Sequence, residues 1–88
     1  MLNLHITSKF KKQLKNYQYN GKVMQRLEQC GEEILSGTID EKRKDHQLSG
    51  KFLQYREVHL FPDVLMIYYI EGEDCFFVAI GSHADLFW

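Results

Sequence analysis

Apolar and polar residues alternate at the start of the chain in a way that predicts one strand followed by a helix. Residues 2–7, LNLHIT, alternate with a period of two, which is typical of a strand. Ser8 follows as a candidate helix cap, and Phe10 and Leu14 lie four residues apart among lysines. This spacing predicts a short amphipathic helix with one apolar side.

A second, longer helix is indicated after Asn20-Gly21, a dipeptide that commonly interrupts regular structure. Its apolar residues recur at steps of three and four, as one side of a helix requires. We expect it to end near Ser36-Gly37, because glycine readily adopts the backbone conformation that terminates helices. The expected apolar side consists of Val23, Met24, Leu27, Cys30, Ile34 and Leu35.

The second half of the chain changes from helical spacing to runs of aromatic and β-branched residues. Residues 38–51 form a polar connector, and three strand-like segments follow it: FLQYREVHLF, VLMIYYIE and CFFVAIGS. The breaks between them, FPD and EGED, are short enough for hairpins, so we expect an antiparallel meander. The final segment, HADLFW, is expected to form a turn or a short helix.

This order of elements predicts a single α+β domain over residues 1–88. An N-terminal strand and two helices would pack on an antiparallel sheet with a three-stranded C-terminal meander. The longest apolar run, residues 64–70, is too short to span a bilayer, and the N-terminus lacks the pattern of a signal peptide. Cys30 and Cys75 are isolated, which indicates two buried thiols in a reducing cytoplasm rather than a disulfide framework.

Charge is distributed unevenly along the chain, although the net charge is only −1. All 11 Lys and Arg residues lie within residues 1–56, whereas half of the 12 acidic residues lie after residue 56. We therefore expect a basic face and an acidic face. A basic face suits an enzyme that holds nucleic-acid phosphates, although on charge alone a solvated helix surface is the simpler explanation.

Strand alternation places Glu57 and His59 on the same side of one predicted strand, and Asp63 lies in the turn just beyond it. A neighbouring carboxylate orients an imidazole and favours its protonated form. Such a group can give or take a proton near neutral pH, since free histidine titrates at ~6.5. A surface histidine with two acidic neighbours is the alternative without a function.

Two further histidines come from distant parts of the sequence. His83 follows the last strand directly, and the meander brings that end of the sheet near Asp63, so these two side chains are expected to approach each other. His46 lies on the polar connector between Lys44 and Lys51, which form a candidate phosphate cradle. The alternatives are a histidine that caps the closing turn and an ordinary surface loop.

Several imidazoles, a carboxylate and lysines, with no P-loop, suit the cleavage of an RNA backbone. In that reaction the ribose 2′-OH attacks the adjacent phosphate, one group removes the 2′ proton and another protonates the departing 5′ oxygen. No metal or cofactor is required. Phe87 and Trp88 are candidates for stacking an unpaired base, with completion of the core as the alternative.

Residues 44–87 match one family pattern along their whole length. K-D-H-x-L-x-G is followed by Y-R-[DE]-x-H-x-x-P-D, an aliphatic strand ending in Tyr, and G-[ST]-H-x-x-L-F. This combination resembles the YafQ branch of the RelE/ParE toxin superfamily. The resemblance implies a RelE-like fold and the toxin of a type II toxin–antitoxin pair. Such toxins are small, metal-independent endoribonucleases that cut mRNA in the ribosomal A site and arrest translation.

Carried over position by position, the resemblance implies a catalytic set and a substrate-binding set. His83 would be the general acid, and His46 or His59 the base or phosphate stabiliser, helped by Asp63. Glu57 stands where the family often has Asp, and its longer side chain moves the carboxylate outward. Phe87 would orient the substrate. The catalytic candidates are His46, His59, Asp63 and His83, and the substrate-binding candidates are Lys44, Lys51, Arg56, Glu57 and Phe87.

The resemblance also implies partners. These are a cognate antitoxin that wraps the toxin, mRNA on the ribosome, and operator DNA bound by the complex through the antitoxin, with no membrane and no cofactor. The chain is less basic than toxins that work on the ribosome, so residues 9–15 and 42–51 would have to concentrate positive charge locally. Three alternatives stay open. They are a non-catalytic ParE-like gyrase inhibitor, an inactive antitoxin-binding homologue, and a zinc site formed by His46, His59, Asp63 and His83.

Overall fold

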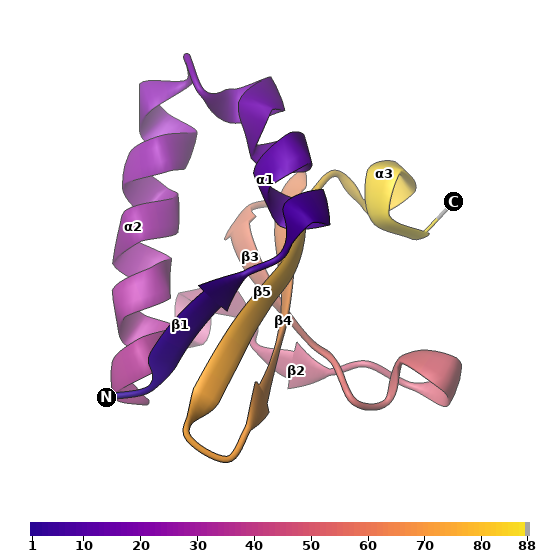
Figure 1. Ribbon diagram of the computed structural model, residues 1–88. Helices are drawn as coiled ribbons and strands as arrows, with labels where there is room; N and C mark the ends of the chain where they lie inside the picture. The colour runs from indigo at the N-terminus through magenta and orange to yellow at the C-terminus, as the bar shows by residue number, and fades with distance from the viewer. Residues whose placement is uncertain (88) are drawn as a thin grey trace.

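The computed structural model describes residues 1–87, and Trp88 lies outside the described residues. A five-stranded sheet with the order β1-β5-β4-β3-β2 carries two helices on one face (Figure 1). The helices are α1 (Ser8–Leu14) and α2 (Gly21–Ser36), and the short helix α3 (His83–Phe87) follows the last strand. The strands are β1 (Asn3–Ile6), β2 (His46–Gln47), β3 (Arg56–Phe61), β4 (Val64–Glu71) and β5 (Asp74–Gly81). Three 3-10 turns complete the elements: η1 (Lys15–Tyr17), η2 (Glu41–Arg43) and η3 (Gly50–Phe52).

The predicted meander is confirmed, since β3, β4 and β5 pair antiparallel in succession. β1 adds to the free edge of β5 in the parallel direction, and β2 adds to β3 in the antiparallel direction. The α+β class is therefore as predicted, and the sheet contains one parallel pair. Among residues 1–87, no helix is both long and apolar enough to cross a membrane.

Local capping explains where the two main helices begin and end. The side chain of Thr7, not that of Ser8 as predicted, accepts a hydrogen bond from the Phe10 backbone at 3.1 Å and caps α1. Thr7 keeps the extended backbone of the preceding strand, as a cap residue does. Asn20 caps α2 in the same way, and Gly37 ends it with a left-handed backbone of φ 76°.

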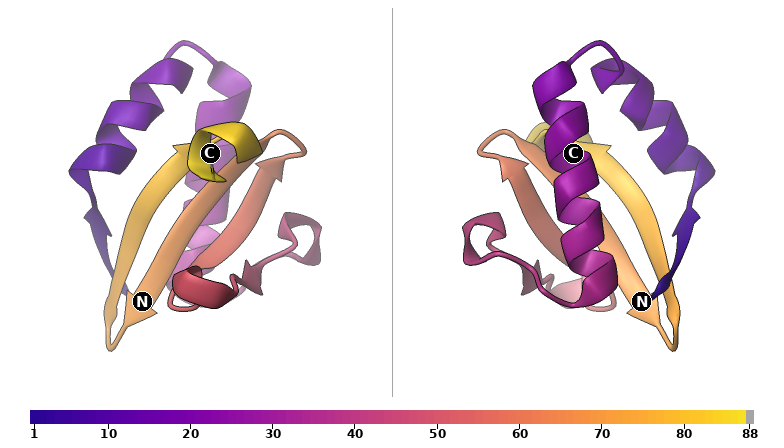
Figure 2. Two further views of the ribbon diagram at one scale, coloured as in Figure 1. Left: turned by 90° about the vertical axis from the view of Figure 1, so that its right-hand side faces the viewer. Right: turned by 90° about the vertical axis from the view of Figure 1, so that its left-hand side faces the viewer.

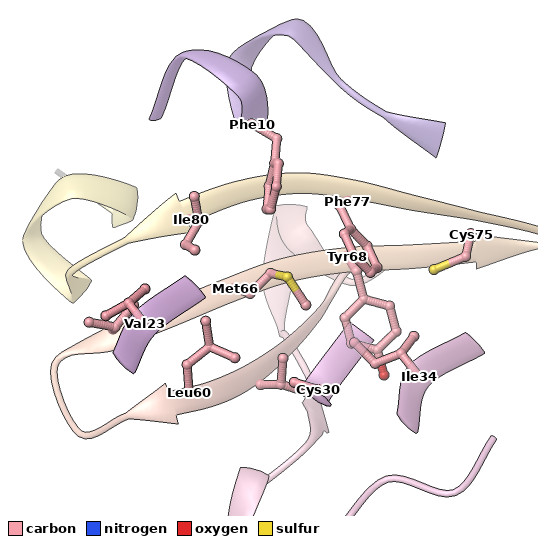
Figure 3. Packing of buried hydrophobic residues seen from close by; sticks show 12 residues of the cluster. Phe10, Val23, Cys30, Ile34, Leu60, Met66, Tyr68, Cys75, Phe77 and Ile80 are labelled. Carbon is pink, nitrogen blue, oxygen red and sulfur yellow. The ribbon is translucent and has the colours of Figure 1, made fainter. Parts of the chain in front are cut away.

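The core lies between α1, α2 and the inner face of the sheet (Figure 3). Phe10 of α1 and Cys30 and Ile34 of α2 are buried against it, together with Met66 and Tyr68 of β4. Burying one large apolar side chain contributes roughly 1.5–3 kcal/mol, so these contacts hold the helices to the sheet. The expectation of two buried, unpaired thiols is confirmed, because both cysteines are free and buried.

The outer face of the sheet has a small apolar floor of its own. It consists of three buried residues, Leu65, Ile67 and Ala79. In the register of the sheet, Ile67 is paired with Ala79 of β5, and Leu65 and Ile67 are paired with outward residues of β3. None belongs to the helix-facing core. Figure 2 (left) shows α3 and the segment around η3 on this outer side, opposite α2. The outer face is therefore partly covered by these two segments, and its apolar floor is buried.

The polar connector is more structured than its sequence indicates. It contains η2, the two-residue strand β2 and η3, whereas we predicted an unstructured connector and a strand that already begins at residue 52. The strand begins only at Arg56, because the backbone turns through Gly50 (φ 64°) and η3 first. Glycine is suited to this positive φ, which residues with a side chain rarely adopt.

Candidate active site

Three side chains from two strands meet on the outer face. The register pairs His46 of β2 with Glu57 of β3, which places both side chains on the same side. His59 Nε2 lies 3.0 Å from Glu57 Oε1, and the rings of His46 and His59 lie 6.3 Å apart between centroids. One ligand atom from each residue lies within 4.8 Å of the others. We call these three residues the histidine–glutamate cluster.

The members of this cluster differ in exposure. The Glu57 side chain is only 8% exposed, whereas the His59 side chain is 27% exposed and His46 is exposed. The carboxylate is thus shielded behind the imidazoles, where it holds the His59 ring in one orientation. The two imidazoles remain accessible to a substrate. The predicted alternation of Glu57 and His59 with inward Val58 and Leu60 is confirmed by the burial of the latter two.

A backbone carbonyl selects the tautomer of His46. His46 Nδ1 lies 2.8 Å from the carbonyl oxygen of Lys44, whose backbone is left-handed with φ 53°. A carbonyl can only accept, so Nδ1 carries the proton in this bond. The lone pair of a neutral His46 is therefore on Nε2, which is the atom that can take a proton from a substrate.

The residue before His46 anchors it to the sheet. Asp45 accepts two hydrogen bonds from Arg56, at 3.2 and 3.0 Å, and one from the hydroxyl of Tyr68 at 2.7 Å. Burial, then the bond to Asp45, raises the pKa of Tyr68, and the bond to Asp45 raises the pKa of Arg56. Arg56, which we predicted to bind substrate, thus also holds Asp45 in place through its guanidinium.

A second group on the outer side comes from α3. The His83 ring lies 4.9 Å from the Phe87 ring, which in turn lies 6.0 Å edge-on from the Phe52 ring of η3. Ser82 and Asp85 cap the helix reciprocally, each side chain accepting from the other's backbone at 3.1 Å. His83 is exposed. Within residues 1–87, no hydrogen bond or ring contact joins it to the histidine–glutamate cluster.

Gly81 sets the approach of α3 to the sheet. A Cβ atom at this position would lie 3.0 Å from the Asp85 Cβ, a tighter contact than most Cβ atoms make. The absence of a side chain at Gly81 therefore permits the chain to turn directly from β5 into the helix that carries His83.

Asp63 is exposed in the turn between β3 and β4. It lines a cavity of about 420 Å³ together with Tyr17 and Ser82, next to the start of α3. Burial, then Asp85 and Asp63, raises the pKa of Tyr17. Asp63 thus lies at the end of the sheet from which α3 starts, and among residues 1–87 no hydrogen bond or ion pair joins it to a histidine.

The two predicted lysines lie on either side of His46 and are exposed. Lys51 places its ammonium 5.3 Å from the centroid of the Phe52 ring. Sequence reasoning missed Asp45 and Tyr68, although Asp45 stands within the K-D-H motif, which was the available signal. Trp88, which we considered for stacking a base, lies outside the described residues.

The cluster also has a donor set that metals use. Two imidazole nitrogens and a carboxylate oxygen are ligands typical of zinc and copper sites. This trio includes Glu57 and excludes Asp63 and His83, so it differs from the zinc site considered from the sequence. The residues present therefore fit a transition-metal ion through three ligands.

Comparisons with known proteins show the family to which this fold belongs. Residues 2–88 match the family model described as the bacterial toxin of a type II toxin–antitoxin system, YafQ. The mRNA interferase toxin YafQ of Escherichia coli K12 is 29% identical over 87 residues, covering 97% of this chain and 95% of that protein.

Two solved structures show the same fold over nearly the whole chain. A metal-bound toxin from Helicobacter pylori is 36% identical, with a TM-score of 0.89, and the match covers 99% of this chain and 100% of that one. The Escherichia coli DinJ–YafQ complex is 28% identical, with a TM-score of 0.88 and full coverage of both chains. The chain therefore belongs to the YafQ family of bacterial toxins of type II toxin–antitoxin systems.

Proposed function

We propose that this toxin is an mRNA endoribonuclease that uses imidazole acid–base catalysis. The observation that carries the proposal is the histidine–glutamate cluster on the outer face, with α3, the helix that contains His83 and Phe87, on the same side. The name of the Escherichia coli relative, mRNA interferase toxin, supports the same reaction.

The chemistry follows from the atoms that each side chain presents. Nε2 of His46 takes the 2′ proton of the ribose, because its Nδ1 is held by the Lys44 carbonyl. The 2′ oxygen then bonds to phosphorus as the bond to the 5′ oxygen breaks. His83 gives its proton to the departing 5′ oxygen. His59, oriented by Glu57, stabilises the charge that develops on the phosphoryl oxygens. The products are a 2′,3′-cyclic phosphate and a 5′-hydroxyl end.

Aromatic and basic side chains around the site suit a single-stranded substrate. Phe87 and Phe52 meet edge-on and offer a stacking surface beside His83. One stacked base is worth ~1–3 kcal/mol. Lys44 and Lys51 flank His46 and supply positive charge to the phosphates. We include Asp63 in the catalytic set as a residue that contacts the bound RNA near His83, from the wall of the neighbouring cavity.

The proposed cellular setting follows from this substrate. The toxin acts in the cytoplasm on mRNA in the ribosomal A site. A cognate antitoxin inhibits it, as is supported by the solved complex of a relative with DinJ. Together the two proteins bind operator DNA through the antitoxin.

Expression in bacteria tests the proposal directly. Wild type should arrest growth and leave transcripts cut at defined positions, whereas His83→Ala should do neither. His5→Ala is the matched control, because His5 is exposed, pairs with Asp74 and lies outside the cluster. Unchanged toxicity of His83→Ala would reject the nuclease. Gyrase-dependent DNA damage would instead support a ParE-like inhibitor.

A second candidate function is metal binding at the histidine–glutamate cluster. The 4.8 Å grouping of its ligand atoms favours it, and a relative from Helicobacter pylori is described as metal-bound. We expect zinc or copper to bind there and to occupy the nitrogen that catalysis uses, so metal should inhibit cleavage. Calorimetry of the wild type and Glu57→Gln measures this binding. Activity that is lost to a chelator and restored by zinc would contradict inhibition.

A further inference from the structure

A basic cavity lies at the edge of β3, beside the candidate active site. β2 is only two residues long and pairs with Arg56 and Glu57, so it leaves the rest of that edge unpaired. A cavity of about 290 Å³ lies there, between η2 and α2. Its ionisable lining residues are Arg26, Lys42, Arg43, Lys44 and His59. Among the described residues, no carboxylate lines it.

Arg26 is held in place before any ligand arrives. Its Nη1 donates to the carbonyl oxygen of Leu60 at 3.0 Å, and its guanidinium lies 4.6 Å from the centroid of the Phe61 ring. Within residues 1–87, Arg26 forms no ion pair. A guanidinium fixed by stacking loses little conformational entropy on binding, and its remaining N–H groups match a phosphate.

The turn η2 supplies the other charges from a fixed backbone. Arg43 is buried and pairs with Glu33 at 3.0 Å, so it holds the turn while its own charge is offset. Asp40 accepts from the Lys42 backbone at 2.8 Å. Lys44 has a left-handed backbone, and its carbonyl oxygen accepts the hydrogen bond from His46. The uncompensated positive charge of the cavity therefore comes from Arg26, Lys42 and Lys44.

We propose that this cavity binds a phosphate of the RNA chain next to the linkage that is cleaved. The proposal rests on the nuclease function above and adds a substrate subsite to it. His59 belongs both to the cavity and to the histidine–glutamate cluster, so an RNA strand that places one phosphate at the cluster reaches the cavity with a neighbouring phosphate. The site reads the backbone and not the bases, because its charged groups suit phosphate oxygens.

Binding of a non-cleavable 2′-O-methyl RNA oligonucleotide tests the cavity without requiring cleavage. Lys42→Gln removes the charge of one exposed residue that lines the cavity, and it should lower the affinity about threefold to tenfold. The slope of log affinity against log salt should fall by ~0.7, the value for one lost contact to a single strand. Gln18→Ala, at an exposed uncharged position between η1 and α2, should change neither quantity.

Arg26 provides a second, independent variant. Arg26→Gln should weaken binding more than Lys42→Gln. Arg26→Lys should recover part of the loss, because lysine restores the positive charge but not the paired N–H donors of the guanidinium. The melting temperature of each variant shows whether the fold is kept. In the wild type, titration with inorganic phosphate should shift the NMR signals of Lys42, Lys44 and the Arg26 Nε–H.

Several outcomes would overturn the subsite. These are equal RNA affinity and salt slope in wild type and Lys42→Gln, or no phosphate-induced shift at these residues. A Lys42→Gln defect confined to antitoxin binding would make the cavity a protein-docking surface instead. If the oligonucleotide binds as predicted but no transcript is cut in cells, the subsite stands and the nuclease function fails.

Discussion

The anchor at Asp45 makes a prediction that separates stability from catalysis. Asp45 joins the segment that carries His46 to Arg56 and to the hydroxyl of Tyr68. Asp45→Ala removes all of these bonds at once. It should lower both the stability of the fold and the rate of RNA cleavage, whereas Glu41→Ala, at an exposed position of the neighbouring turn, should lower neither by much.

The magnitude follows from the burial of the partners. Tyr68 is fully buried, so its hydroxyl would be left unpaired at a cost of about 1–3 kcal/mol. The Arg56 side chain is 39% exposed and can turn to water, so its contribution is at most ~1 kcal/mol. We therefore expect a loss of about 1–4 kcal/mol in the free energy of unfolding, against less than ~0.5 kcal/mol for Glu41→Ala.

Urea unfolding followed by circular dichroism measures this loss. Tyr68→Phe provides a further test, because its effect on stability should have opposite signs in the Asp45→Ala variant and in the wild type. In the Asp45→Ala background, Tyr68→Phe removes the unpaired hydroxyl and should raise stability, although it should lower stability in the wild type. The double variant should still cleave RNA slowly, because the His46 segment stays unanchored. Asp45→Ala with wild-type stability, or simple additivity of the two substitutions, would refute the reasoning.

Three further predictions concern charge and protons. Glu57→Gln should slow single-turnover cleavage by about tenfold or more (~1.4 kcal/mol in the barrier), because the partner that orients His59 at 3.0 Å loses its charge; a wild-type rate would contradict this role. The cleavage rate should be bell-shaped in pH, since an imidazole base and an imidazole acid must hold opposite protonation states; a flat profile from about pH 5 to 8 would count against it. Burial raises the pKa of the Cys30 and Cys75 thiols to about 11 and raises the pKa of Tyr68 too, whereas unfolded thiols ionise from 9.0 upward. The free energy of unfolding should therefore fall as pH rises from about 9 to 11, and urea midpoints that stay constant over that range would contradict it.

Patterns of residues predicted the helices, the meander and the pairing of Glu57 with His59, because each depends on spacing within one element. The parallel pairing of β1 with β5 could not be predicted in this way. Alternation within β1 predicts a strand, but it does not show which strand β1 joins or in which direction. β2 has only two residues and thus no period, so the contact between His46 and Glu57 emerged only from the sheet register.

The role of Arg56 shows a further limit of sequence reasoning. Its position in the motif indicated a substrate contact, but a basic residue near acids can equally serve the fold. Only the positions of Asp45 and Tyr68 show that Arg56 also serves the fold. The same holds for Arg26, which belongs to α2 by pattern and to the basic cavity by its position in space.

The chemistry of the cut ends tests the central claim most directly. Purified toxin should cleave mRNA on programmed ribosomes and leave a 2′,3′-cyclic phosphate and a 5′-hydroxyl. A single 2′-deoxy nucleotide at the cleaved position should block the cut, and His46→Ala and His83→Ala should each slow it by about 10²–10⁴-fold. Cleavage of the deoxy substrate at the wild-type rate, or products with a 5′-phosphate, would contradict attack by the 2′-hydroxyl under imidazole catalysis.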